Sequence, residues 1–292
     1  MTTIVIGLAP GDRGEPAIHL GAMIARSTAS PLVVAAITPT PWPPSPIGGD
    51  AEYLRLQHDS AEEALERARE IIGPDVASRF QVETARSVTD GLLQAAARAE
   101  AGLVVLGSGT SGPPRRVSLG SIAQRILSSL DTPVCFAPAD FTVPIGARLS
   151  RITVGFGRSD RDSELLRAAI ERATEFGIAL RVACFAVRPS TFARGSIEVA
   201  ADDLVVGEWA AQLRAEILYA ASQAGADPAT LEIVLGAGTS WDEAIASVPW
   251  TATDLLAIGA KTSAISRFVL GSHAAKIVKH SPVPVLTVAR AG

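Results

Sequence analysis

The sequence predicts two tandem, doubly wound α/β domains, each with a five-stranded parallel sheet flanked by helices. Short apolar runs, which are typical of strands buried on both faces, alternate with amphipathic helical patterns along the chain. In addition, one arrangement of strand, glycine loop and helix occurs twice, over residues 103–131 and again over residues 255–278. A repeat at about half the chain length indicates an internal duplication.

Matched positions of the two copies lie at nearly constant separations of 148, 152, 151 and 151 residues. These pairs are Gly7 with Gly155, Gly107 with Gly259, Gly120 with Gly271, and Pro133 with Pro284. We therefore expect domains at 1–140 and 149–292, joined by a linker at 141–148. Fused copies usually reproduce the pairing of a homodimer, so we expect an intramolecular pseudo-dimer, and a further homodimer is left open.

The first copy is expected to alternate strands and helices in the order βαβαβαβαβ. The expected strands are 3–7, 32–37, 80–84, 103–106 and 132–136, and the expected helices start at Glu15, cover 51–72 and 90–101, and follow Gly120. Five prolines and Trp42 in residues 38–49 argue against regular structure there. This segment is either a flap over a site or a long connection.

The second copy repeats this order after the linker. Its expected strands are 151–155, 180–187, 231–235, 255–258 and 282–288, and its expected helices are 162–176, 202–224, 240–248 and 274–278. Gly177 fits a helix C-cap, and Ser240 with Glu243 fits a capping box.

Composition excludes several classes of function. The net charge is −4 and no basic cluster exceeds Arg115–Arg116, so no nucleic-acid partner is expected. No apolar run approaches the ~20 residues of a membrane helix. The chain begins directly on a strand, so we expect no signal peptide and a cytoplasmic location. Cys135 and Cys184 lie in apolar runs and are expected to be small buried hydrophobes rather than catalytic thiols.

The candidate site lies in the loops after Ile6, Ile37 and Leu106. Ligands of doubly wound sheets bind at the carboxyl ends of the strands, where the strand order reverses. A glycine loop that leads into a helix presents backbone N–H groups to an anion, usually phosphate. The alternative is that the glycines only end a strand and Ser121 only caps the next helix.

Three features resemble the universal stress proteins over almost the whole chain. They are the run 4–7, a Gly-x-x-small-x9-Gly-Ser loop between strand and helix, and a Pro-Val strand that closes each copy. The resemblance implies the adenine nucleotide alpha hydrolase-like fold, with ATP as the ligand and Mg only together with ATP. It places the site at Gly107, Thr110, Gly120, Ser121, Ile37 and Ala9 in the first copy, and at Gly259, Gly271 and Ser272 in the second.

Both copies depart from the pattern of the ATP-binding members, Gly-x-x-Gly-x9-Gly-Ser/Thr with an Asp after the first strand. Thr110 and Thr262 stand at the second glycine, and the second loop is one residue short. Ala9 and Gly157 stand at the Asp, and neither side chain can accept a hydrogen bond. The sequence therefore predicts degenerate nucleotide sites.

No nucleophile elbow, paired carboxylates, metal spacing or Walker lysine is visible, so the chain is expected to be at most a slow ATPase. Two functions stay open. One is a stress-response binding or signalling protein with degenerate ATP binding, and the other is a nucleotide-independent scaffold with vestigial sites and unknown protein partners. Arg115 and Arg116 either add charge at the phosphates or lie in a solvated loop, and Lys261 and Arg267 have the same alternatives. His273 either faces a ligand or packs.

Overall fold

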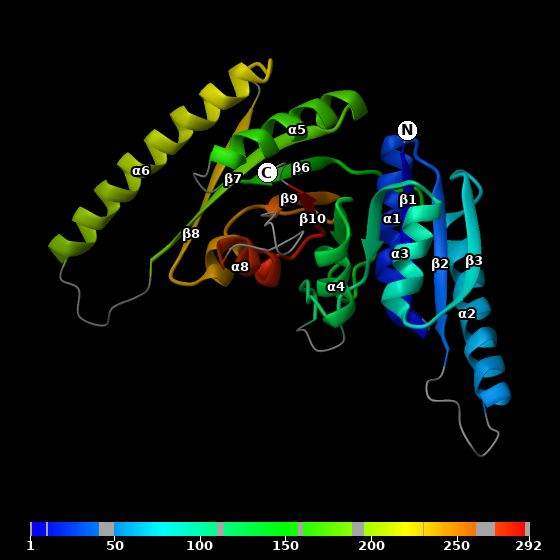
Figure 1. The fold of residues 1–292 in the computed structure, drawn as a ribbon. Coiled ribbons are helices and arrows are strands. Elements are labelled where there is room, and N and C mark those ends of the chain that lie inside the picture. The colour runs from blue at the N-terminus through cyan, green and yellow to red at the C-terminus, as the bar shows by residue number, and fades with distance from the viewer. Residues whose placement is uncertain are drawn as a thin grey trace.

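The computed structural model describes residues 2–9, 11–40, 50–109, 114–156, 160–188, 196–229, 231–260 and 272–289. Within these ranges the chain forms one α/β structure in which helices cover a single large sheet (Figure 1). Each half contributes five strands to this sheet.

The first half contains β1 (Thr3–Leu8), β2 (Leu32–Pro39), β3 (Ser78–Ala85), β4 (Ala101–Leu106) and β5 (Val134–Phe136). Its helices are the 3-10 helix η1 (Gly11–Gly14), α1 (Glu15–Thr28), α2 (Asp50–Ile72), α3 (Val88–Arg98) and α4 (Ser121–Ser129). The second half contains β6 (Arg151–Gly155), β7 (Ala179–Val187), β8 (Glu232–Gly238), β9 (Asp254–Ala260) and β10 (Val285–Ala289). Its helices are α5 (Asp160–Phe176), α6 (Ser196–Gln223), α7 (Trp241–Ala246) and α8 (Ser272–His280).

The two halves are joined through their last strands. The strand order is β3-β2-β1-β4-β5-β10-β9-β6-β7-β8, and the second half therefore repeats the order of the first in reverse. Pairing is parallel within each half and antiparallel between β5 and β10, where Leu286 lies opposite Cys135. The buried hydroxyl of Thr287 donates to the Val134 carbonyl at 2.9 Å across this seam. The intramolecular pairing thus merges two parallel sheets into one mixed sheet.

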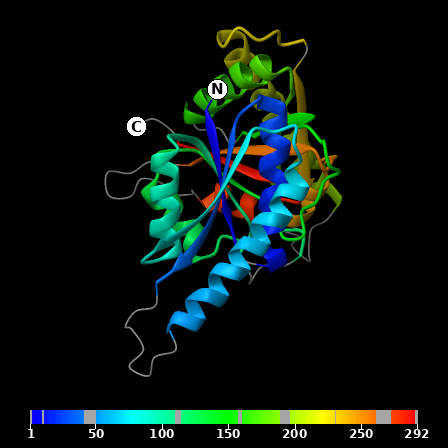
Figure 2. The ribbon, with the colours of Figure 1, turned by 90° about the vertical axis from the view of Figure 1, so that its right-hand side faces the viewer.

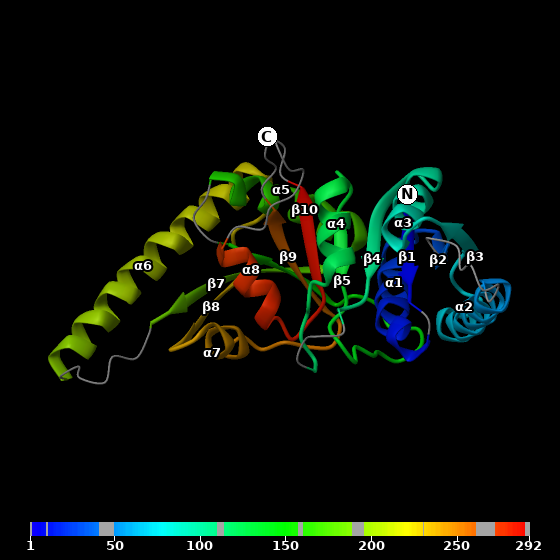
Figure 3. The ribbon, with the colours of Figure 1, turned by 60° about the horizontal axis from the view of Figure 1, so that its bottom comes forward.

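The hydrophobic cores cross the seam as well. On the face covered by α3 and α4, Phe136 belongs to the same buried cluster as Leu256, Ile258 and Val285 of the second half. On the other face, the cluster under α1 and α2 reaches Ile152. Figure 2 shows these helix pairs on opposite sides of the twisted sheet, and Figure 3 shows that the long helices α2 and α6 lie toward opposite ends of the molecule.

The expected elements are all present, and two local predictions differ from the structure. The helix expected over 90–101 ends at Arg98, because Glu100 takes a left-handed φ of 46° and Ala101 already belongs to β4. Strand β2 continues to Pro39, although regular structure was not expected there. Pro39 pairs with β3 alone, because the pairing of β2 with β1 has already ended at Ala36. The missing N–H of proline therefore leaves no hydrogen bond of the sheet unmade. Residues 41–49 lie outside the described ranges.

The two predicted caps have different outcomes. Gly177 has φ +63°, and the Ile178 N–H donates to the Ala173 carbonyl at 2.9 Å, which confirms the glycine C-cap of α5. Ser240 accepts from the Glu243 N–H at 3.2 Å as an N-cap should. The reciprocal half of the capping box is wrong, because the Glu243 carboxylate accepts from the N–H and hydroxyl of Thr239 instead.

Both cysteines are free and buried, as expected. Burial raises the pKa of the Cys184 thiol to about 12 and raises the pKa of the Cys135 thiol as well. Neither thiol therefore has thiolate character near neutral pH. Within the described ranges, no helix combines the length and apolar character needed to cross a bilayer.

Candidate functional site

A pocket of about 480 Å³ opens at the carboxyl ends of β1 and β4. The strand order reverses between these two strands, which is the position where doubly wound sheets bind ligands. Four of the predicted site residues line this pocket, namely Ala9, Gly107, Gly120 and Ser121. Ile37 does not line it: its side chain is buried in the core, where it would contact a Cβ placed at Gly91 of α3. Thr110 lies outside the described residues.

The N-terminus of α4 faces this pocket without a side-chain cap. Gly120 is the N-cap residue, and Ser121, Ile122 and Ala123, which form the first turn, line the pocket. The interpretation of Ser121 as the cap is therefore wrong, because Ser121 is already helical. Backbone N–H groups of a first helical turn have no intrahelical partner, and the helix dipole is positive there. This end of α4 suits an anion.

Gly120 is not required by backbone strain. Its φ of −70° and ψ of 175° are ordinary extended values. A Cβ at Gly120 would meet only the Gly109 Cα, at 3.5 Å, whereas a Cβ at Gly109 would lie 2.9 Å from the Gly120 nitrogen. Gly109 is thus needed for close packing of the loop, and Gly120 leaves space on the pocket side.

Ser108 fixes the base of the loop, a role that the sequence analysis missed. Its hydroxyl donates to the Ala137 carbonyl at 2.7 Å and accepts from the Ser118 N–H at 3.1 Å. The Gly109 N–H donates to the Ser118 carbonyl at 2.7 Å, so the two ends of the loop are held together. No local pattern distinguishes Ser108 from the other serines of this loop, because its partners lie 10 and 29 residues away.

We expect Ser108→Ala to lower the free energy of unfolding by about 1–3 kcal/mol, because it leaves the backbone N–H of half-buried Ser118 and the carbonyl of buried Ala137 without this partner. Chemical denaturation measures the change. The control is Ser128→Ala on the exposed side of α4. The Ser128 hydroxyl donates only to the Arg125 carbonyl of the same helix, so little change in the free energy of unfolding is expected. Equal effects of the two substitutions would contradict the role of Ser108.

Arg13 is the one charged residue among the described residues that line the pocket. It belongs to η1, directly after β1, and its carbonyl lies 3.4 Å from a Cβ built at Gly107. The family pattern places a carboxylate in this segment, and no local pattern marks Arg13 as a residue of the site. Arg13 thus brings a basic residue to the pocket that the N-terminus of α4 also lines.

The arginine pair of the glycine loop does not line the pocket. Arg116 forms a 2.8 Å ion pair with Asp242 of α7, and its side chain therefore connects the loop to the second half. Arg115 has a left-handed φ of 56° and lines a separate pocket beside Trp250. The structure thus supports neither predicted role for Arg116, because it is neither at the phosphate end nor freely solvated.

The second copy of the site is described only at its ends. Gly259 is buried in β9, and Ser272 is the exposed first residue of α8. Gly271, Lys261 and Arg267 lie outside the described residues. The ring of His273 lies 5.4 Å from the ring of Trp241, which agrees with the packing alternative for His273.

Comparison with known proteins agrees with this architecture. The model of the universal stress protein family matches residues 1–138 and 149–289. The chain belongs to this family. A universal stress protein of Mycobacterium tuberculosis strain H37Rv is 35% identical over 295 residues, covering 98% of this chain and 99% of that protein.

Solved structures of universal stress proteins share the fold. One from Archaeoglobus fulgidus DSM 4304 matches with a TM-score of 0.62 at 14% identity, over 99% of this chain and 98% of its own. Another from Archaeoglobus fulgidus, solved in complex with dAMP, matches 47% of this chain and 98% of its own at 19% identity, with a TM-score of 0.37. The first likeness covers both halves of this tandem chain.

Proposed function

We propose that this universal stress protein binds an adenine nucleotide in the pocket between β1 and β4 of a first domain at 1–140, and acts in the cytoplasm as a stress-response binding or signalling protein. The observation that carries the proposal is the convergence of Ala9, Gly107 and Gly120 on one pocket from segments about a hundred residues apart. Its volume lies within the ~300–1,000 Å³ range of small-molecule sites.

The phosphates would lie at the N-terminus of α4. The free N–H groups of residues 121–123 would supply donors there, and the guanidinium of Arg13, which also lines the pocket, would add positive charge. None of the described lining residues is acidic, so Mg²⁺ would arrive with the phosphates of ATP and would not be held by protein carboxylates. Ala9, in place of the Asp of ATP-binding members, removes one contact to the nucleotide.

Thermal unfolding with millimolar MgATP, compared with MgGTP and with buffer, tests the proposal. A ligand that binds only the native state stabilises it by RT ln(1 + [L]/Kd), about 2.7 kcal/mol at a hundredfold excess over Kd. We expect an upward shift with ATP that exceeds the shift with GTP. No shift, or equal shifts with both nucleotides, would contradict adenine-nucleotide binding and favour the nucleotide-independent scaffold.

We expect Gly120→Val to abolish the ATP shift, because its side chain fills the space beside the α4 N-terminus while the backbone conformation stays allowed. The matched control is Gly207→Ala on α6, where an added Cβ meets nothing within 4 Å. Unfolding without ligand verifies that both variants are folded. A full ATP shift in folded Gly120→Val would place the nucleotide elsewhere.

A further inference from the structure

A larger pocket, of about 740 Å³, lies at the opposite end of the first-half sheet. The amino ends of β1, β2 and β3 contribute Thr3, Val33 and Arg79, and α3 contributes Ala95 and Arg98. It shares no lining residue with the pocket at the carboxyl ends of β1 and β4. An inference about this pocket therefore does not depend on nucleotide binding.

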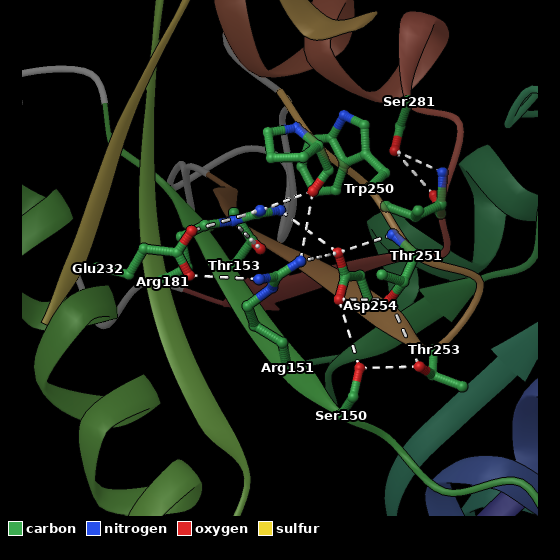
Figure 4. A network of polar contacts seen from close by, with 12 residues as sticks. Ser150, Arg151, Thr153, Arg181, Glu232, Trp250, Thr251, Thr253, Asp254 and Ser281 are labelled. Carbon is green, nitrogen blue, oxygen red and sulfur yellow. Dashed lines mark hydrogen bonds and ion pairs between the residues drawn. The ribbon is translucent and has the colours of Figure 1, made fainter. Parts of the chain in front are cut away.

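The corresponding place in the second half is filled by a network of charged side chains (Figure 4). The side chains of Arg181 and Asp254 are fully buried there. The guanidinium of Arg181 donates to the Thr153 hydroxyl at 3.1 Å and to the Pro249 carbonyl at 2.8 Å, and it lies 4.8 Å from the centre of the Trp250 ring. The Asp254 carboxylate accepts from Arg151 at 2.8 Å.

The strand registers relate this network to the pocket position by position. The equivalent residues are Arg151 and Thr3, Asp254 and Gly102, Arg181 and Val33, and Glu232 and Arg79. Thr3, Val33 and Arg79 line the pocket. The first half therefore has a pocket because the short side chains of Thr3 and Val33 stand where the second half has two arginines. On the edge strand, the acidic residue of the second half is replaced by the basic Arg79.

The lining of the pocket has an unbalanced charge. Arg79 and Arg98 are basic, and no acidic residue lines the pocket among the described residues. Arg98 is paired with Glu83. Among the described residues no hydrogen bond or ion pair is found for the Arg79 side chain, so its five N–H groups are available to a ligand. Val33, Ala95 and Ala99 provide an apolar wall.

We propose that this pocket binds a small organic anion with an apolar body. A carboxylate or a similar planar anionic group would pair with the Arg79 guanidinium, which presents two parallel N–H donors to such groups. The apolar body would lie against Val33 and α3, where the second half holds the side chain of Arg181 beside Trp250. The chain would have one such site, because its own side chains occupy the equivalent space in the second half.

Isothermal titration of the full chain with 1-naphthoate, and with uncharged 1-naphthamide, tests this proposal. We expect saturable one-to-one binding of naphthoate, at least tenfold weaker binding of naphthamide, and weakening of naphthoate binding by added salt. Saturating MgATP should not compete, because the nucleotide pocket lies at the other end of the strands. Absent naphthoate binding, equal binding of both probes, or competition by MgATP would overturn the proposal.

Three substitutions test whether Arg79 provides the positive charge that binds naphthoate. Arg79→Glu, which installs the residue type of the equivalent Glu232, should weaken naphthoate binding at least tenfold. Arg79→Lys should retain most of it. The control Arg86→Glu changes the net charge equally at an exposed residue that does not line this pocket, and it should bind as the parent does. Equal weakening by Arg79→Glu and Arg86→Glu would overturn the role of Arg79.

Discussion

Replacing Asp254 with alanine is expected to lower the free energy of unfolding by about 3–5 kcal/mol. The Asp254 carboxylate is fully buried and accepts from Arg151 at 2.8 Å, from Arg181 at 3.4 Å and from the Thr251 N–H at 3.1 Å. Without it, the buried guanidinium of Arg181 keeps neutral hydrogen-bond partners and only the half-exposed carboxylate of Glu232, 3.9 Å away, as a charged neighbour. Removing one partner of a buried ion pair is costly because the other partner's charge stays in the protein interior without compensation.

The pKa directions agree with this role of Asp254. Its hydrogen bond raises the pKa of Arg151, whereas burial and the neighbouring Arg151 charge lower the pKa of Arg181. Asp254 thus offsets the repulsion between the two guanidinium groups, with Glu232 as a smaller second contribution.

Glu232→Ala is the matched control for Asp254→Ala. Glu232 contacts the same two arginines, at 3.2 Å and 3.9 Å, but its side chain is 45% exposed. A solvent-exposed ion pair contributes only about 0–1 kcal/mol. Urea denaturation of both variants gives the comparison. If Asp254→Ala lost no more stability than Glu232→Ala, the buried network would not be a main source of stability in the second half.

Replacing Phe136 with alanine is expected to cost about 3–5 kcal/mol and to destabilise both halves together. Phe136 is completely buried in β5, lies opposite Val285 of β10, and belongs to the core cluster that contains residues of both halves. Removing the ring leaves a cavity at the seam. The two halves share this core, and hence neither should unfold before the other.

Two probes can measure this coupling in the same urea titration. Three of the four tryptophans, Trp209, Trp241 and Trp250, lie in the second half, so fluorescence reports mainly that half, while far-UV circular dichroism reports both. We expect the two transitions to coincide in the parent and in Phe136→Ala. Ile145→Ala, at a 70% exposed position, should change little. Separate transitions in the parent would show that the halves unfold independently.

The sequence determined the strands, the helices and the duplication of this protein. Apolar runs such as 103–106 are short and continuous because these strands are buried on both faces, so their period and length identify them locally. The glycine loop also predicted a candidate site at the carboxyl ends of the strands, and Ala9, Gly107 and Gly120 line one pocket there. Local sequence patterns predict these elements and the glycine loop because turn and helix preferences depend on residues that are close together in the sequence.

Only the tertiary structure decided how distant segments meet. The antiparallel pairing of β5 with β10 merges the sheets, and nothing within either apolar strand specifies its partner. Arg13 and Ser108 acquire their roles through neighbours that are far away in the sequence, and Arg116 pairs with Asp242, 126 residues away. Val33 and Arg181 are likewise shown to be equivalent only by the strand register, which places each beside its edge-strand partner. The open pocket and the buried network then differ because different side chains stand at these equivalent positions.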